Sequence, residues 1–80
     1  MVDQADEAVL LDRARNGDTA AFDVLITRHR EKIYVHAYQL LRNEDDAMEI
    51  AQETFIRAWR SVARFDGKAS LASWLYRIAV

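Results

Sequence analysis

The sequence predicts an all-α fold, and three observations carry this prediction. Pro is absent from the 80 residues and Gly occurs only at positions 17 and 67, so little interrupts a helix. Ala, Leu, Arg and Glu, which favour helices, are abundant. The 51% hydrophobic and 30% charged content is typical of a globular domain. We therefore expect residues 1–80 to form one compact helical bundle of three main helices and a fourth that the chain end truncates.

The first half of the chain predicts two helices separated by a tight turn. A short helix over about residues 3–15 ends at Asn16-Gly17, where a left-handed backbone conformation is typical. Asp18 is then a good N-cap for a second, longer helix. With no Gly or Pro to stop it, this helix is expected to continue to about Arg42.

The second half of the chain predicts two more helices. Asn43 caps a third helix over about residues 44–64, and the acids of its first turn suit the helix dipole. Residues 65–69 form the expected loop, and Ser70 caps the fourth helix.

At 100° per residue, each of the last three helices has an apolar face that we expect to form the core. The expected core positions are Phe22, Leu25, Ile26, His29, Ile33, His36, Ala37 and Leu40; Ala47, Met48, Ile50, Ala51, Phe55, Ala58, Trp59 and Val62; and Leu71, Trp74, Leu75 and Ile78.

Nothing in the sequence favours a metal site, a cofactor or an enzyme. His29 and His36 lie seven residues apart, roughly 10 Å along a helix, so another helix would have to supply ligands between them. Cys is absent, so we interpret both as histidines at the edge of the core. We find no Ser/His/Asp arrangement, no phosphate-binding Gly-rich loop and no paired-carboxylate site.

The third helix carries an unusual polar face opposite its core face. Glu49, Gln52, Glu53 and Arg60 surround one aliphatic side chain, Ile56, at spacings of three, four and seven. One interpretation is a solvated face with a single exposed apolar residue, which is common. The other is a docking face for a partner helix, with an apolar centre and a charged rim.

The fourth helix and the loop before it predict a second surface. Ser73, Tyr76 and Arg77 are expected to point away from the core, beside Phe65 and Lys68 in the loop. Rings and cations together suit single-stranded nucleic acid, which stacks its bases and carries charged phosphates. The alternative is an ordinary surface patch in which Phe65 packs inward.

Charge along the chain alternates in sign although the net charge is only −2. Residues 1–27 carry −4, residues 28–42 carry +3, residues 43–56 carry −5 and residues 57–80 carry +4. This alternation indicates two kinds of surface with two kinds of partner.

Several motifs resemble region 2 of bacterial sigma factors of the extracytoplasmic-function (ECF) type. They are residues 46–60 (DAMEIAQETFIRAWR), 64–67 (RFDG) and 74–80 (WLYRIAV), in the family's order and separations. Asn16-Gly17-Asp18, Ala21-Phe22 and Leu25-Ile26 fit the start of that region. The resemblance covers nearly all 80 residues and is therefore specific.

The resemblance implies a transcription initiation factor that joins core RNA polymerase. In the family, the acidic third helix docks on the clamp coiled coil of the largest catalytic subunit. This implies Glu49, Gln52 and Glu53 as docking residues, on the same predicted face as Ile56 and Arg60.

The resemblance also implies contact with promoter DNA. The family's loop between the third and fourth helices receives a flipped base of the minus-ten element, and its fourth helix lines the opened non-template strand. Lys68 is then an expected phosphate contact. The implied DNA-binding positions are Phe65, Asp66, Gly67, Lys68, Ala69, Ser73, Tyr76 and Arg77.

Family members continue past this region with the rest of the fourth helix, a linker and a helix-turn-helix domain, so we expect this chain to be a fragment. Anti-sigma proteins commonly occlude the region, which makes an anti-sigma factor a candidate partner.

The rival hypothesis is a helical interaction domain, a sigma-like regulator or anti-sigma target, that does not bind DNA. Without a long apolar run or a leader, we expect a cytoplasmic location and no membrane insertion.

Overall fold

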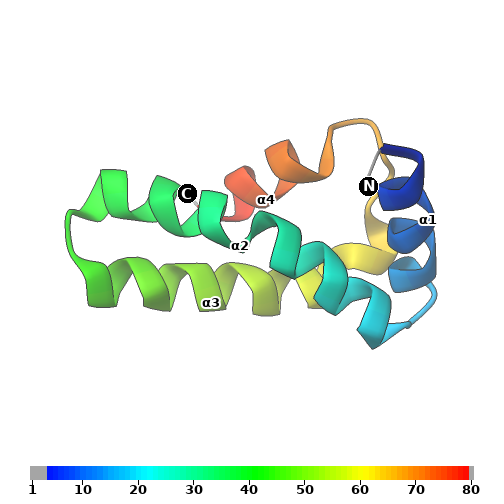
Figure 1. The fold of residues 1–80 in the computed structure, drawn as a ribbon, viewed down its shortest axis with the longest axis horizontal. Coiled ribbons are helices and arrows are strands. Elements are labelled where there is room, and N and C mark those ends of the chain that lie inside the picture. Colours follow the sequence, from blue (N-terminus) through cyan, green and yellow to red (C-terminus); the bar gives the residue numbers. More distant parts are fainter. Residues whose placement is uncertain (1–3, 80) are drawn as a thin grey trace.

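The computed structural model describes residues 4–79, and the predicted all-α fold is confirmed (Figure 1). No strand occurs within that range. The elements are α1 (Gln4–Arg15), α2 (Thr19–Leu41), α3 (Glu44–Ser61), the 3-10 helix η1 (Val62–Arg64) and α4 (Leu71–Ala79).

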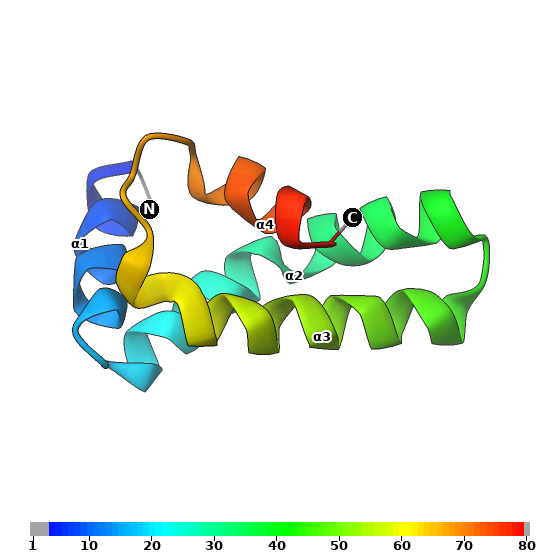
Figure 2. The ribbon, with the colours of Figure 1, turned by 180° about the vertical axis from the view of Figure 1, so that it is seen from behind.

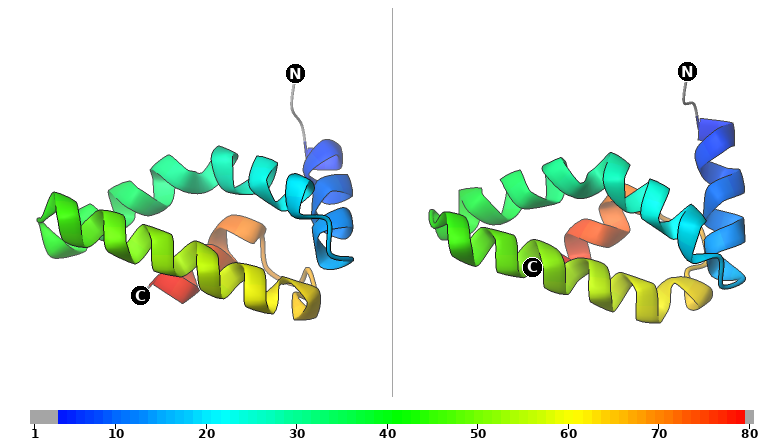
Figure 3. Two further views of the ribbon diagram at one scale, coloured as in Figure 1. Left: turned by 90° about the horizontal axis from the view of Figure 1, so that it is seen from below. Right: turned by 60° about the horizontal axis from the view of Figure 1, so that its bottom comes forward.

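The two longest helices, α2 and α3, form an antiparallel hairpin (Figure 1). α1 lies across the end of the hairpin where α2 begins and η1 follows α3 (Figure 2). α4 packs against both α3 and α2, and it is joined to η1 by the one long connection among the described residues (Figure 3). That connection and α4 carry all of the predicted DNA-binding residues.

The predicted helix caps are confirmed. Asp18, Asn43 and Ser70 each accept a hydrogen bond from the backbone N–H three residues later, at 3.1, 2.9 and 3.1 Å. Each side chain therefore satisfies a backbone donor that the first helical turn leaves free.

The turn between α1 and α2 is also as predicted. Gly17 has φ +97°, in the left-handed region that favours glycine. The hydrogen bond from the Ala21 N–H, together with one from Arg13, holds the pKa of Asp18 below its usual range.

The core lies where α4 covers the α2–α3 hairpin. Leu25 and Ile33 of α2 and Leu75 of α4 are its largest fully buried aliphatic side chains. Small residues line the α3 side: Ala47, Ala51 and Ala58 are buried there. Small side chains at such positions allow two helices to pack closely.

The observed burial overturns part of the predicted core. Met48 and Leu40 were expected to be buried, but they are 55% and 61% exposed. Trp59 is also partly exposed, although its ring packs 5.0 Å from that of Phe22. Thr54 was not predicted, yet it is 1% exposed. Its hydroxyl donates to a carbonyl one turn earlier in α3, at 2.7 Å, which satisfies the buried polar group.

The two histidines lie in different surroundings. His29 is buried, with Nε2 3.0 Å from a carboxylate oxygen of Glu7 in α1. His36 is half-buried, and its ring lies 5.0 Å from that of Tyr76. Among the described residues, no cluster of His, Cys, Asp and Glu is arranged to hold a metal ion. In the same part of the chain, no helix is long and apolar enough to cross a membrane.

Candidate functional site

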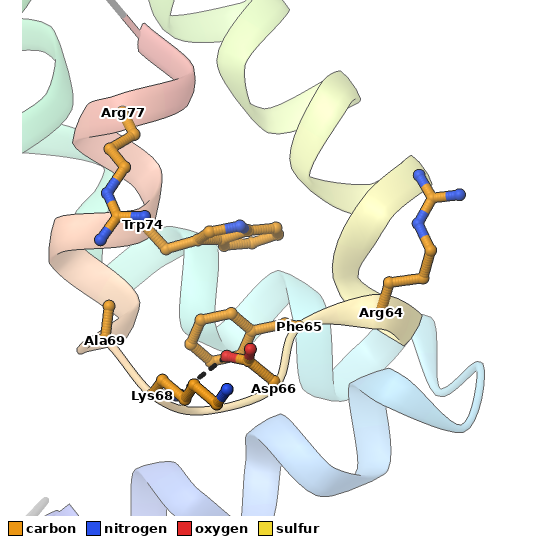
Figure 4. Close-up of a pocket in the computed structure, with 7 residues that line it drawn as sticks. All are labelled: Arg64, Phe65, Asp66, Lys68, Ala69, Trp74 and Arg77. Carbon is orange, nitrogen blue, oxygen red and sulfur yellow. Dashed lines mark hydrogen bonds between the residues drawn. The ribbon is translucent and has the colours of Figure 1, made fainter.

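A pocket of about 450 Å³ lies between η1 and the start of α4, at the predicted DNA-binding loop (Figure 4). Five residues of that prediction line it, and sequence reasoning missed two others, Arg64 and Trp74. The lining residues are Arg64, Phe65, Asp66, Lys68, Ala69, Trp74 and Arg77.

Two aromatic rings form the inner wall of this pocket. The ring centroids of Phe65 and Trp74 are 4.9 Å apart with an interplanar angle of 41°. Phe65 is only 5% exposed, so it packs inward, and Trp74 is half-buried beside it (Figure 4). The pocket therefore offers an aromatic wall rather than a ring that projects freely into solvent.

A short turn at residues 66–68 shapes the loop, and the Lys68 side chain at its end is exposed to solvent. The Asp66 carboxylate accepts a hydrogen bond from the Lys68 N–H at 3.0 Å (Figure 4). Gly67 between them has φ +79°, which only glycine adopts readily. The side chains of Arg64, Lys68 and Arg77 are exposed around the pocket, so positive charge dominates it.

Tyr76 does not face this pocket, which corrects the predicted outward surface of α4. Its ring contacts His36 of α2, and it lines a separate hollow with α2 side chains. The neighbouring Arg77 lies on the pocket side, because successive helical residues are about 100° apart. Ser73 is exposed, and its backbone N–H and hydroxyl both bond to Ser70.

A larger hollow, the α2–α3 groove, lies on another side of α3. Its volume is about 860 Å³ and its walls are mainly apolar. The lining residues are Ile26, Thr27, Arg30, Glu31, Tyr34, Met48, Ala51, Gln52, Phe55 and Ile56.

The groove brings together only part of the predicted docking face. Gln52 and Ile56 line it, whereas Glu49 and Glu53 are exposed on α3 outside its lining. Ile56 is 47% exposed at the groove, which accounts for an aliphatic residue in a polar face. Arg60 instead lines a recess between α3 and α4. Sequence reasoning missed the α2 wall: it assigned Ile26 to the core and named no partner surface for Thr27, Arg30 or Tyr34.

The sequence was compared with models of known protein families. The model described as sigma-70 region 2 matches residues 25–80. The chain belongs to the sigma-70 region 2 family. This confirms the resemblance drawn from the sequence, and the relatives are of the ECF type. Sigma factors are transcription initiation factors, not enzymes.

Known sigma factors match this region 2 chain along most of its length. It is 38% identical over 82 residues to the ECF RNA polymerase sigma-E factor of Haemophilus influenzae and 35% identical over 80 residues to the RNA polymerase sigma-H factor of Pseudomonas aeruginosa. Both matches cover 100% of the chain and 42% of the relative. The match to the ECF factor SigW of Bacillus subtilis, 40% identical, covers 84% of the chain and 36% of that relative.

A solved structure has the same region 2 fold. An engineered region 2 of sigmaE, in complex with GTAAAA, superposes with a TM-score of 0.86 and 34% sequence identity. The match covers 99% of this chain and 82% of the other.

Proposed function

We propose that this chain docks on the clamp coiled coil of core RNA polymerase and captures a base of the minus-ten element from the non-template strand. The observation that carries this proposal is the pocket of Phe65, Trp74 and three exposed cations at the loop before α4. Its DNA half is supported by the sigmaE region 2 relative, which is described in complex with GTAAAA.

The α2–α3 groove supports the protein-docking half of the proposal. Met48 and Ile56 expose apolar surface along it, and Glu49 and Glu53 add negative charge beside it. An apolar centre with a charged border is typical of a surface that binds a helix. The partner surface is then expected to present aliphatic anchors next to basic side chains.

The pocket supports the DNA half because base capture needs both stacking and charge. Unstacking a base costs a few kcal/mol, which contacts in the pocket must offset. Trp74, the half-buried ring of the aromatic wall, offers stacking worth about 1–3 kcal/mol for one base. Arg64, Lys68 and Arg77 can contact the neighbouring phosphates. With a net charge of −2, the chain is expected to bind DNA weakly unless polymerase holds the promoter in place.

Fluorescence anisotropy with labelled single strands tests both halves. The 80-residue chain is titrated into GTAAAA and into a random hexanucleotide pool, with and without bacterial core polymerase. We expect polymerase to strengthen binding and Lys68→Ala to weaken it, whereas Arg42→Gln, at the far tip of the hairpin, is the matched control. Glu53→Lys should weaken binding to the isolated clamp coiled coil. Undiminished binding by Glu53→Lys would contradict the docking face.

The burial of Phe65 and the larger volume of the groove favour a second candidate, a helical interaction domain that binds protein but not DNA. Such a domain would be a sigma-like regulator or an anti-sigma target. If Lys68→Ala and Arg77→Ala leave DNA capture unchanged while groove variants abolish polymerase binding, this candidate replaces the first. An anti-sigma factor would then be the predicted occupant of the same groove.

Either function would operate in the bacterial cytoplasm, where polymerase and promoter DNA are found.

A further inference from the structure

One face of α2 is used by neither of the proposed partners, and it lies on the side where α4 packs against that helix (Figure 1). A hollow of about 450 Å³, here called the α2–α4 hollow, lies on this face. Its lining residues are Arg28, Glu31, Lys32, Val35, His36, Gln39 and Tyr76.

This face of α2 combines exposed aliphatic side chains with positive charge. Val24 and Val35 are 42% and 43% exposed. Between them, Lys32 is exposed and Arg28 is half-buried, and the spacings of three and four place all four residues on one side of the helix. Glu31 is the one acid that lines the hollow, and it also lines the α2–α3 groove. Apolar surface beside an excess of cations suits an acidic partner.

The hollow also contains a polar group that the chain itself does not satisfy. Nε2 of His36 is buried there, with no hydrogen-bond partner among the residues that the structure describes. Buried polar groups in native proteins are almost always paired, and an unpaired one destabilises the fold. This group favours a surface that a partner completes.

The acidic face of α3 matches the hollow in charge and in spacing. Its exposed residues Glu49, Glu53 and Ile56 are separated by four and three positions. The bases at positions 28 and 32 and the valine at position 35 repeat these separations on α2. Because every α-helix rises by the same distance per residue, a parallel arrangement of the two helices places each acid beside a base and Ile56 beside Val35. Within one chain α2 and α3 are antiparallel, so this contact requires two copies (Figure 1).

We infer that the α2–α4 hollow binds the acidic face of α3 in a second copy of this chain. The contact joins two different surfaces, so it is heterologous, and each end of an assembly keeps one surface open. The occupied face of α3 is the one that the proposed function assigns to polymerase. Self-association therefore holds the chain in a form that cannot dock, and polymerase releases it. The inference goes beyond the proposed function, because the contact between two copies needs neither polymerase nor DNA.

Sedimentation equilibrium of the 80-residue chain tests this contact. Concentrations from about 10 µM to about 1 mM cover the range of weak association. In about 0.05 M salt we expect the mean mass to rise with concentration, and in about 0.5 M salt this rise should shrink because the charges are screened. Lys32→Glu or Glu53→Lys should each weaken association about fivefold or more, since a reversed charge replaces an attraction with a repulsion.

Mixing the two variants tests whether these two surfaces are partners. In an equimolar mixture, the intact hollow of the Glu53→Lys chain can receive the intact acidic face of the Lys32→Glu chain, so association should return to that of the unmodified chain. Arg15→Glu, at an exposed position of α1, changes the net charge as Lys32→Glu does and should leave association unchanged. Lys and Glu both favour helices, so the variants should fold, which circular dichroism measures.

The contrary outcomes separate this inference from the proposed function. A chain that stays monomeric at every concentration overturns the inference, leaves the proposed function standing and leaves the hollow to an acidic segment of another protein. Association that persists in Lys32→Glu, that falls equally in Arg15→Glu, or that does not return in the mixture also overturns it.

The isolated clamp coiled coil provides the last arm of the experiment. Added to the associated chain, it should replace the larger species by a one-to-one complex, because both partners need the acidic face of α3. If the coiled coil binds but the assembly persists, that face is not the contact between copies, and the inference fails. If the chain associates as expected but the coiled coil does not bind it even at low protein concentration, the docking half of the proposed function fails and the self-contact stands.

Discussion

The α2–α3 groove and the pocket before α4 differ in how their residues contribute to folding. The groove arises where regular helices pack through small residues, so Met48 and Ile56 stay exposed and little of the core depends on them. The pocket arises from a loop whose aromatic wall is part of the core, with Phe65 buried against Trp74. Substitutions of Met48 or Ile56 should therefore affect binding alone, whereas those in the pocket wall should also affect stability.

Phe65→Ala should have the largest effect and tests this difference most directly. Removing a buried aromatic side chain leaves a cavity and costs about 3–5 kcal/mol of unfolding free energy. This is a large part of the roughly 5–15 kcal/mol that stabilises a typical domain. Urea denaturation followed by circular dichroism measures the loss.

Phe65→Leu separates stability from binding. It fills most of the cavity, so the unfolding free energy should largely recover. Because Phe65 is only 5% exposed, a remaining loss of base capture would report on the support that its ring gives to Trp74. A Phe65→Ala chain that unfolds at the same urea concentration as the unmodified chain would show that the pocket wall is not part of the core.

Ile56→Asp in the groove should show the opposite behaviour. Because Ile56 is 47% exposed, the unfolding free energy should change by no more than about 0.5 kcal/mol. Binding to the clamp coiled coil should weaken about tenfold or more, since a charge would be desolvated in an apolar contact. Isothermal titration calorimetry measures the affinity. Val9→Asp, at a side chain of α1 that is 57% exposed, is the matched control, and an equal loss of affinity there would remove the groove from the docking surface.

The sequence predicted the helices and their caps well because these depend on local residues. Asp18, Asn43 and Ser70 each bond to a backbone group three residues away, which is a local property. Gly17 likewise marks the end of α1 by its own conformation. The helix boundaries therefore followed from short-range chemistry.

Which side of a helix faces its neighbour could not be predicted as well. Tyr76 contacts α2, and Met48 lines the groove. Both placements depend on how neighbouring helices pack against one another, which the periodicity of a single helix does not determine. Thr54 was missed because its buried hydroxyl bonds within its own helix. The loop at this pocket was predicted as a DNA-binding segment from its family motif and from its rings and cations. Trp74, which was placed in the predicted core, also lines the pocket.

Asn43→Ala should have a moderate effect that spares both surfaces. The Asn43 side chain accepts from the Asp46 N–H at 2.9 Å in the turn between α2 and α3. Losing such a cap costs about 1 kcal/mol, which lowers the midpoint of thermal unfolding by roughly 4–8 °C in a domain of this size. Asn43→Asp keeps the cap and should keep the midpoint. Below the midpoint, weaker binding to either partner would mean that the hairpin tip contributes to binding.

The Glu53–Arg57 ion pair should have the smallest effect, although it lies on the border between the two surfaces. Its Nε–Oε2 distance is 3.1 Å and both side chains are about half exposed. A double-mutant cycle with Glu53→Gln and Arg57→Gln should give a coupling of about 0.3–0.5 kcal/mol that falls as salt is added. A coupling above about 1 kcal/mol, or one insensitive to salt, would contradict a solvent-screened pair.

The expected weakness of this pair limits how much polymerase binding at one surface can change DNA affinity at the other. If polymerase engages Glu53, Arg57 loses its ion-pair partner, and the added positive charge can strengthen DNA binding by no more than the energy of the pair, about twofold. Any larger effect of polymerase on DNA capture must then come from its hold on the promoter, which raises the local concentration of the strand at the pocket. Without polymerase, Glu53→Gln should therefore bind the hexanucleotide at most about twofold more tightly than the unmodified chain does, as measured by anisotropy at low salt.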